Sequence, residues 1–221
     1  MVRLFFGRTT LVESGIALKK RLEVIALSVL EPVSLRGSVV LLEPMSLAHV
    51  EPLSRVGLDS ELWRWIPSAV TTAQEMRSYV EKALDEQQRG ASLPFVIIVA
   101  ATGQIIGSTR YGNIDLANRR LEIGWTWVTA SYQRTAVNTE AKLLLLTHAF
   151  ERLKMNRVEL KTDALNQKSR TAIARLGATQ EGIFRKHIVT ASGRVRDTVY
   201  YSIIDTEWPG VKGRLQDWLR R

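Results

Sequence analysis

Two features of the sequence could do chemistry together: the carboxylate of Glu122 and the polar loop from Gln133 to Asn138, which contains Arg134. Glu122 lies in a run of alternating apolar and polar residues, which predicts a strand. A strand glutamate that faces a cleft could take a proton from an ammonium group, directly or through water. An ion pair across the sheet with Arg110 or Arg120 is the alternative role for this side chain.

The polar loop leads into a helix that is apolar around most of its circumference, so we expect a central helix at Thr139–Arg152 that is buried on more than one side. Asn138 or Thr139 is predicted to cap its first turn. A loop that feeds a helix N-terminus points several N–H groups and the positive end of the helix dipole at one spot, which suits a phosphate. Such junctions are common and most of them bind nothing.

Composition limits the classes of protein and of site. A chain of 221 residues is long enough for one well-buried domain and a tail. It contains no cysteine, which excludes disulfides, thiolate metal ligands and a cysteine nucleophile, and fits a reducing compartment such as the cytoplasm. The three histidines, His49, His148 and His187, lack metal-ligand spacing, so we expect no metal. No apolar run reaches the ~18–20 residues of a membrane span, so no membrane partner is expected.

The net charge of +9 is spread unevenly along the chain. Residues 1–37 hold six basic and three acidic residues, residues 38–164 hold fourteen of each, and residues 165–221 hold eleven basic against five acidic. The excess is diffuse and partly terminal, which argues against a nucleic-acid partner. It could attract a phosphate-bearing coenzyme or an acidic surface, or it could simply be a solvated basic surface.

Periodicity and turn signals predict the order β, α, α, β, β, β, α, β, α, β, β. The strands are expected at Val39–Leu42, Phe95–Ala100, Gln104–Tyr111, Leu121–Val128, Arg157–Thr162, Thr179–Val189 and Val195–Ile204. The helices other than the central one are expected at Ser46–Leu53, Thr72–Arg89 and Asn166–Leu176, and the last of these ends at Gly177. Residues 35–205 are expected to form the domain, after an N-terminal extension of uncertain order (1–34) and before a basic, helical tail (206–221).

The segment YQRTAVN at 132–138, followed by TEAK, resembles the acyl-CoA pyrophosphate loop of the GNAT superfamily of N-acetyltransferases, and is most similar to the RimJ/RimL-type branch. The superfamily pattern is Gln/Arg-x-x-Gly-x-Gly/Ala, and Ala136 and Asn138 stand here where glycines are usual. The order of elements from about Val33 to Ile204 also fits. The resemblance implies an α/β (α+β) fold, with a mixed, mostly antiparallel central sheet, helices on both faces and a V-shaped splay between the fourth and fifth strands.

The resemblance also implies a site. Pantetheine would lie in the splay, and the phosphates on the helix N-terminus. The main chain of six loop residues and three strand residues would bind the coenzyme: Arg134, Thr135, Ala136, Val137, Asn138, Thr139, Trp127, Val128 and Thr129. Asn166 and Ser169 resemble the Asn-x-x-Ser motif. Asn166 would bind the pantetheine amides. Relatives usually carry a tyrosine as the general acid on this helix, but Ile173 occupies its position here. Ser169, near the leaving thiolate, would take its place.

Trp63 and Trp65 lie in the loop that walls the acceptor pocket in relatives, and packing in the core is the alternative for each. The function implied is transfer of the acetyl group of acetyl-CoA to a primary amine, on a protein N-terminus or a small molecule, by direct attack in a ternary complex. Glu122 and Ser169 would be the catalytic residues. A non-catalytic acyl-CoA sensor of the same fold is the alternative, and a homodimer is left open.

Overall fold

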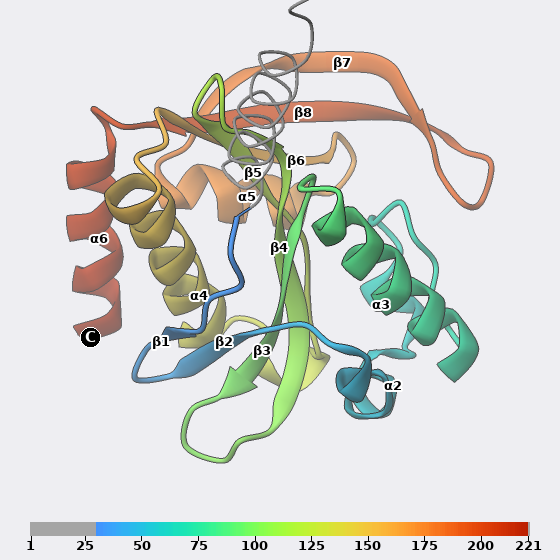
Figure 1. The fold of residues 1–221 in the computed structure, drawn as a ribbon. Helices are drawn as coiled ribbons and strands as arrows, with labels where there is room; N and C mark the ends of the chain where they lie inside the picture. The colour runs from blue at the N-terminus through green and yellow to red at the C-terminus, as the bar shows by residue number, and fades with distance from the viewer. Residues whose placement is uncertain (1–29, 221) are drawn as a thin grey trace, which may run out of the picture.

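The computed structural model describes residues 30–220, so most of the expected N-terminal extension (1–34) lies outside the described residues. Within this range, eight strands form one sheet in the order β1-β2-β3-β4-β5-β6-β8-β7 (Figure 1). The strands are β1 (Leu35–Arg36), β2 (Val40–Pro44), β3 (Leu93–Val99), β4 (Ile105–Asp115), β5 (Arg120–Val128), β6 (Arg157–Asp163), β7 (Thr179–Val189) and β8 (Val195–Ile204). The bounds of β7 and β8 are those that the sequence predicts.

Every strand pair in this sheet is antiparallel except β5 and β6. The parallel pairing of β5 with β6 covers only three residue pairs, from Arg120↔Arg157 to Glu122↔Glu159, although β5 continues to Val128. The two strands therefore separate beyond Glu122. This confirms the predicted mixed sheet and places the splay between the strands labelled β5 and β6.

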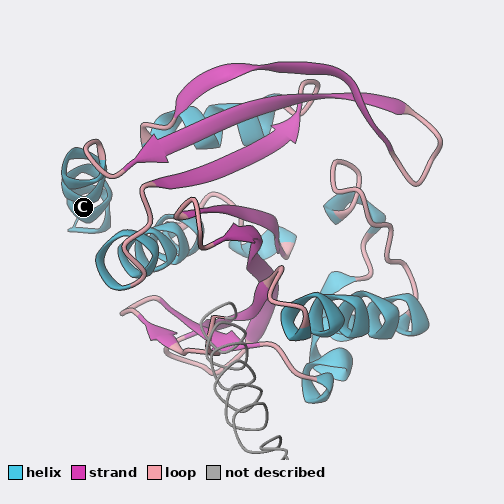
Figure 2. Cartoon of the chain, turned by 45° about the horizontal axis from the view of Figure 1, so that its top comes forward, coloured by secondary structure: helices cyan, strands magenta, loops and turns pink. Residues whose placement is uncertain are grey.

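Helices cover both faces of the sheet (Figure 2). They are α2 (Val50–Gly57), α3 (Ala73–Gln88), α4 (Ala136–Thr147), α5 (Gln167–Leu176) and α6 (Trp208–Arg220), and a π-helical turn (His148–Arg152) extends α4. Two apolar clusters fill the interior. One joins α4 and α6 to the sheet, and the other joins α2 and α3 to its opposite face.

Local signals fix most of the helix ends. The helix predicted to start at Thr72 does so: Thr72 caps α3 in a capping box with Glu75. Gly177 ends α5 in the left-handed conformation (φ 99°) that a non-glycine residue rarely adopts. The predicted start of the central helix is wrong: α4 begins at Ala136, and its N-cap is Thr135, whose hydroxyl accepts from the N–H of Val137 at 3.3 Å.

Glu140 joins the first turns of α4 to the segment at the start of β2. Its buried carboxylate accepts hydrogen bonds from the N–H groups of Ser38 (3.0 Å), Val39 (2.6 Å) and Val40 (2.7 Å), and from the Ser38 hydroxyl (2.8 Å). A Cβ on Gly37 would lie 2.3 Å from the same carboxylate, so only glycine fits there without displacing it. Because carboxylate bonds to N–H groups are among the stronger hydrogen bonds, Glu140 fixes α4 against β2.

The helix α6 packs against α4. Trp208 stacks on Phe150 with ring centroids 5.4 Å apart, and its indole N–H donates to Glu151 at 2.8 Å. Lys212 Nζ donates to the same carboxylate at 2.6 Å. Across residues 30–220 there is no helix with the length and apolar character to cross a membrane.

Candidate active site

The splay opens beside a distortion of β5. Between the pairs Ser108↔Trp127 and Arg110↔Gly124, two residues of β5 face one of β4, which is a β-bulge. Trp125 in this bulge has φ 49°, a strained conformation for a bulky residue. Such strain clusters at functional sites, and here it occurs where β5 has left β6.

Backbone groups of β5 point into the splay near its wide end. Thr129 donates its N–H to Ile106 at 2.8 Å, so this N–H, which was predicted to bind the coenzyme, is used within the sheet. Alternation along an antiparallel pair then turns the N–H and C=O of Val128 away from β4, toward the gap. The Val128 carbonyl accepts from Gln133 Nε2 at 2.8 Å. The Val128 N–H is therefore the group that this edge offers to a ligand.

The predicted phosphate loop forms the N-terminus of α4 beside this edge. Arg134 has φ 62° and is exposed, as are Thr135 and Ala136. The first N–H groups of a helix have no partner within it, and the Thr135 hydroxyl takes only that of Val137. Gln133 holds the loop in place through the Val128 carbonyl and through a hydrogen bond from Lys168 Nζ of α5. An exposed helix N-terminus with two cations, on Arg134 and Lys168, fits the phosphates of a coenzyme.

The start of α5 faces the same loop through Lys168. Asn166 is the N-cap of α5, and its side-chain oxygen accepts from the N–H of Ser169 at 3.0 Å. Its side-chain NH₂ is therefore the part that can bind a pantetheine carbonyl. Ser169 is half-buried in the first turn. Ile173, at the usual tyrosine position, is buried in the apolar cluster under α4, so no phenol is present at that position.

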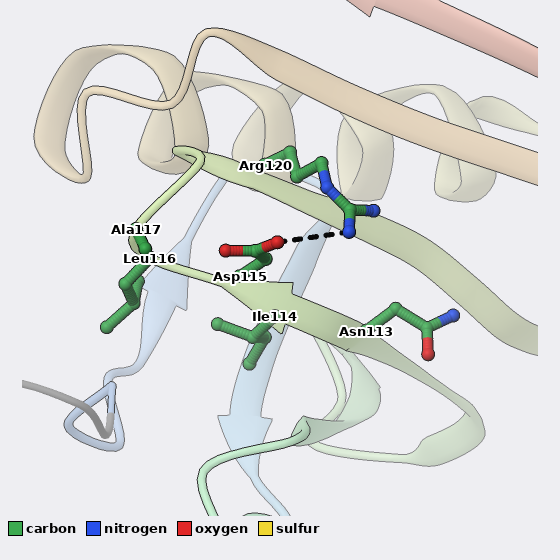
Figure 3. Close-up of a pocket in the computed structure, with 6 residues that line it drawn as sticks. All are labelled: Asn113, Ile114, Asp115, Leu116, Ala117 and Arg120. Carbon is green, nitrogen blue, oxygen red and sulfur yellow. Dashed lines mark hydrogen bonds and ion pairs between the residues drawn. The ribbon is translucent and has the colours of Figure 1, made fainter.

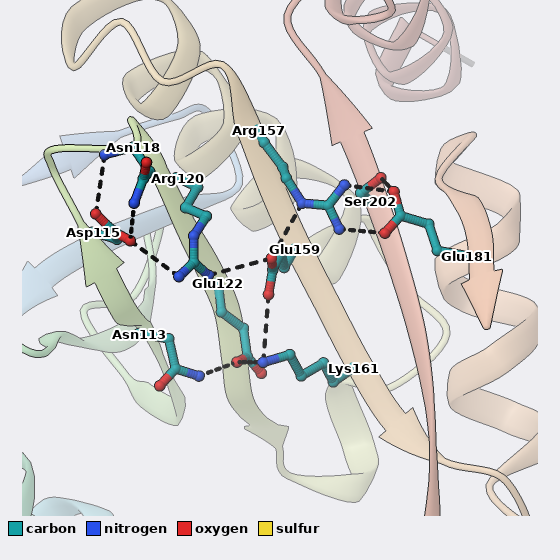
Figure 4. Close-up of polar contacts among 10 residues, drawn as sticks. All are labelled: Asn113, Asp115, Asn118, Arg120, Glu122, Arg157, Glu159, Lys161, Glu181 and Ser202. Atoms are coloured by element: carbon teal, nitrogen blue, oxygen red, sulfur yellow. Dashed lines mark hydrogen bonds and ion pairs between the residues drawn. The ribbon is translucent and has the colours of Figure 1, made fainter. Parts of the chain in front are cut away.

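Glu122 lies at the narrow end of the splay, in the last residue pair that joins β5 to β6. Its side chain is 6% exposed, and Oε2 accepts from Asn113 Nδ2 at 2.6 Å and pairs with Lys161 Nζ at 2.9 Å (Figure 4). The predicted ion pair with Arg110 or Arg120 does not form: Arg110 pairs with Glu86, and Arg120 with Asp115 and Glu159.

The second oxygen of Glu122 is differently placed. A Cβ on Gly124 would lie 3.0 Å from Oε1, so the absence of a side chain at Gly124 keeps space beside this oxygen. Among residues 30–220, no side chain or N–H donates to Oε1. Asn113 and Lys161 thus hold Oε2, whereas Oε1 is free to accept a hydrogen bond from a ligand bound in the splay.

A network of charges extends from Glu122 across the sheet (Figure 4). Lys161 also pairs with Glu159 at 3.4 Å, and Glu159 accepts from Arg157 at 3.1 Å. Burial lowers the pKa of Lys161, but the carboxylate of Glu122, with Tyr200 and Glu159, outweighs it and raises that pKa above its ordinary value. Lys161 therefore stays an ammonium group and keeps Glu122 in position.

The two tryptophans of the predicted acceptor loop differ in burial. Trp63 is 3% exposed, donates its indole N–H to the Gly57 carbonyl at 2.7 Å, and packs against Tyr79 and Trp127. Trp63 therefore lies in the core. Trp65 is half-buried, and Arg64 lies over its ring at 5.1 Å.

The Trp65 segment is joined to β8 by two arginines. Arg196 Nη1 donates to the Trp65 carbonyl at 3.3 Å, and the Arg194 guanidinium lies 5.7 Å from the centre of the Trp65 ring. Both arginines pair with Asp163, which is fully buried at the end of β6. The Asp163 carboxylate also accepts from the N–H of Leu165 at 2.9 Å, and its main-chain carbonyl accepts from the N–H of Asn166 at 3.0 Å, so Asp163 connects these arginines to the start of α5.

One buried titratable group lies behind the bulge. Lys142 of α4 is 6% exposed, and its Nζ donates to the Thr126 hydroxyl at 2.8 Å. No carboxylate among the described residues pairs with it. Burial lowers the pKa of Lys142 from 10.5 to about 7.

A separate hollow of about 500 Å³ lies at the turn between β4 and β5 (Figure 3). Its charged lining residues pair with each other, because Arg120 Nη2 donates to Asp115 at 3.0 Å. Asn113, also at its edge, uses its side chain to hold Glu122. The hollow therefore supports the site and is not part of it. In the described part of the chain, no three His, Cys, Asp or Glu side chains gather as a metal site would require.

Comparison with known proteins agrees with this geometry. The family model described as "Acetyltransferase (GNAT) domain" matches residues 40–179. The chain belongs to the GNAT acetyltransferase family. A GCN5-related N-acetyltransferase from Brucella melitensis is 33% identical, with a TM-score of 0.79 and 86% of each chain covered. Mycobacterium smegmatis RimJ, solved in complex with CoA-disulfide, is 27% identical, with a TM-score of 0.73 over 86% of this chain and 94% of RimJ.

Among sequence relatives, YdaF of Bacillus subtilis, named as a ribosomal N-acetyltransferase, is 36% identical over 110 residues, which are 50% of this chain and 59% of YdaF. The chain thus spans less than two thirds of the length of that relative. The N-acetyltransferase p20 of Bacillus licheniformis is 27% identical over 76% of this chain and 94% of p20. These relatives place the chain in the RimJ/RimL-like branch of the GNAT family.

Sequence reasoning missed several residues of the site. Lys161 and Asn113 hold Glu122, Lys168 adds a cation at the predicted phosphate loop, and Asp163 joins two arginines of β8 to the start of α5. The alternation of charged and apolar residues at Arg157–Asp163 was a usable signal, because it places Glu159, Lys161 and Asp163 on one face of β6. Nothing local in the sequence indicates which of them meets Glu122.

Proposed function

We propose that this protein transfers the acetyl group of acetyl-CoA to the primary amine of an acceptor that binds at the narrow end of the splay. The observation that carries the proposal is the alignment of an exposed helix N-terminus, an unpaired strand edge and a half-anchored carboxylate along one gap in the sheet. The RimJ relative was solved with a coenzyme A derivative, which supports acetyl-CoA as the donor.

The residues of this chain divide the work. The first turn of α4, with Arg134 and Lys168, binds the phosphates, and Val128 and Asn166 bind the pantetheine. Acetyl-CoA bound there would supply the acetyl group as a thioester. Binding both reactants in one gap replaces a bimolecular encounter by a positioned attack.

Glu122 Oε1 accepts a proton from the acceptor's ammonium group, so that the amine can attack the thioester carbonyl as a neutral nucleophile. Lys161 and Asn113 keep Oε2 occupied and aim Oε1 along the splay. The new C–N bond forms as the C–S bond breaks, and the departing thiolate takes a proton from the Ser169 hydroxyl or from water. That donor regains a proton from the attacking nitrogen, which loses its second proton and becomes the amide. Glu122 then returns its proton to solvent.

The acceptor that fits best is the N-terminus of a polypeptide. Arg196 of β8 donates to the Trp65 carbonyl, so the Trp65 segment and β8 lie together on the acceptor side and can both contact a chain that continues beyond the amine. A relative is named as a ribosomal N-acetyltransferase, which supports a protein acceptor. Trp65 forms the wall of this side and Trp63 supports it from the core.

A calorimetric titration with acetyl-CoA tests the coenzyme site. We expect binding in the wild type, weaker binding of dephospho-CoA, and loss of binding in Ala136→Asp, because the new carboxylate would repel the phosphates at the helix N-terminus. Ala117→Asp, which adds the same charge to an exposed turn, is the matched control and should bind normally. Equal affinity in wild type and Ala136→Asp would remove the phosphate assignment. Binding without any acetyl transfer to peptides or small amines would favour an acyl-CoA sensor.

A further inference from the structure

We propose that the arm formed by β7 and β8 binds the polypeptide that follows the acceptor amine, and that it selects a segment with acidic side chains. The inference rests on the proposed function, because it adds a second contact surface to the same acceptor site. Figures 1 and 2 show this arm running across the molecule and ending in a hairpin loop on the same side of the molecule as α3.

Three rings in mutual contact on the arm, Phe184, His187 and Tyr200, form what we call the aromatic platform. Phe184 stacks on Tyr200 with centroids 4.2 Å apart, and His187 meets both rings at 5.3 and 5.7 Å. Lys161 Nζ lies 4.5 Å from the centre of the Tyr200 ring and 2.9 Å from Glu122. A continuous row of side-chain contacts therefore leads from the candidate base to the platform.

The platform is open to a ligand. Phe184 is 51% exposed, and the neighbouring Ile183 is 47% exposed, although both are large apolar side chains. A hollow of about 670 Å³ is lined by Phe184, Arg185, Lys186 and His187. Among residues 30–220, β7 is also the last strand of its sheet, so the backbone groups on its outer side have no strand partner there. Exposed apolar groups beside free strand groups suit an extended polypeptide.

The positive charge of this hollow favours a polypeptide with acidic side chains. Arg185 and Lys186 are exposed, and neither has an ion-pair partner among residues 30–220. The nearby Asp197 accepts from the Lys186 N–H at 2.7 Å, which fixes the bulge where Lys186 has φ 50°. By contrast, Arg194 on β8 is paired with Asp163. Two unpaired cations beside an aromatic surface complement an acidic peptide segment.

The length of this row of side chains distinguishes a polypeptide acceptor from a small amine. An amine at Glu122 Oε1 must extend past Lys161 and Tyr200 before it reaches Phe184 and Arg185. A small amine would occupy only the first part of this path. The arm therefore contributes to recognition only when several residues follow the acceptor amine.

The test uses acceptors that differ only beyond the second residue. Hexapeptides that begin Ser-Ala and continue with four Glu, four Gln or four Lys are compared with the dipeptide amide Ser-Ala-NH₂. Both kcat/KM for acetyl transfer and direct binding by calorimetry are measured at low and high salt. We expect the Glu peptide to exceed the Gln peptide about tenfold at low salt, and salt to reduce the ratio, because exposed charges are screened.

Variants of the full-length protein locate the effect. Arg185→Gln with Lys186→Gln should reduce the preference for Glu over Gln to about twofold, and Phe184→Ala should weaken all hexapeptides about tenfold, while neither changes the dipeptide amide. Lys82→Gln, an exposed lysine on α3, and Val189→Ala, an exposed apolar residue on β7, are the matched controls. Equal activity toward hexapeptides and dipeptide, or an unchanged preference in the double variant, would overturn the inference. Charge-dependent peptide binding without any acetyl transfer would instead contradict the proposed function alone.

Discussion

Replacing Lys142 by methionine tests how the interior behind the bulge is built. The Lys142 ammonium is buried, and the hydroxyl of Thr126 is its hydrogen-bond partner. Burial lowers its pKa from 10.5 to about 7 in the folded protein, whereas the unfolded chain keeps the ordinary value. Methionine has a similar length and no charge, so the variant removes the titration and leaves most of the packing.

The sign and size of the effect follow from proton linkage. Between pH 7 and 10.5 the unfolded chain holds a proton that the folded protein has released, so the free energy of unfolding rises with pH because of Lys142. The rise is 1.36 kcal/mol per pH unit, which amounts to about 4 kcal/mol between pH 7 and pH 10. Below pH 7 both states are protonated, and the full cost of the buried ammonium is present. The variant should therefore gain stability over wild type at pH 6.5 and lose most of this gain by pH 10.

Urea unfolding at pH 6.5, 8 and 10 measures this difference directly. The quantity of interest is the change with pH in the gap between the two unfolding free energies, because a constant packing or hydrogen-bond loss cancels from it. Lys82→Met, at an exposed position, is the control and should give a gap that does not depend on pH. Parallel curves for Lys142→Met and wild type would show that the Lys142 ammonium is solvated, and the reasoning would fail.

Three further predictions concern the residues that position the site. Glu140→Gln should cost about 3–5 kcal/mol in urea unfolding, because an amide cannot accept all four hydrogen bonds, whereas Glu81→Gln on the surface of α3 should cost less than about 0.5 kcal/mol. Asp163→Asn should cost about 3–5 kcal/mol, because it leaves Arg196 buried without its carboxylate, and a loss below about 1 kcal/mol would show that water replaces the pair. Trp65→Ala should raise the KM for a peptide acceptor about tenfold and leave acetyl-CoA affinity unchanged in calorimetry, and a parallel loss of both would make Trp65 a structural residue.

The sequence was most informative where local signals decide the structure. Alternation and a central turn predict β7 and β8 to the residue, and Thr72 predicts the start of α3, where it forms a capping box with Glu75. The start of α4 was missed because Thr135, Asn138 and Thr139 can all cap a helix. Only the backbone, extended at Thr135, decides among them.

The partners within the site could not be predicted in this way. Glu122 meets Lys161 because two strands distant in sequence run parallel for three residue pairs before they separate, and no local pattern encodes that register. The burial of Trp63 likewise depends on Tyr79 and Trp127 packing around it. The family resemblance predicts which segments would bind the coenzyme, whereas tertiary packing determines which side chains beside them are free to act.

The most direct test of the account is acetyl transfer by wild type and Glu122→Gln, followed by mass spectrometry of a peptide with a free N-terminus. The predicted result is one acetyl group on the α-amine with wild type, and a turnover about 10²–10⁴-fold lower with Glu122→Gln at unchanged acetyl-CoA affinity. Equal turnover by the two proteins across pH would make Glu122 structural. Acetyl-CoA binding with no transfer by wild type to any amine would contradict the enzymatic account itself.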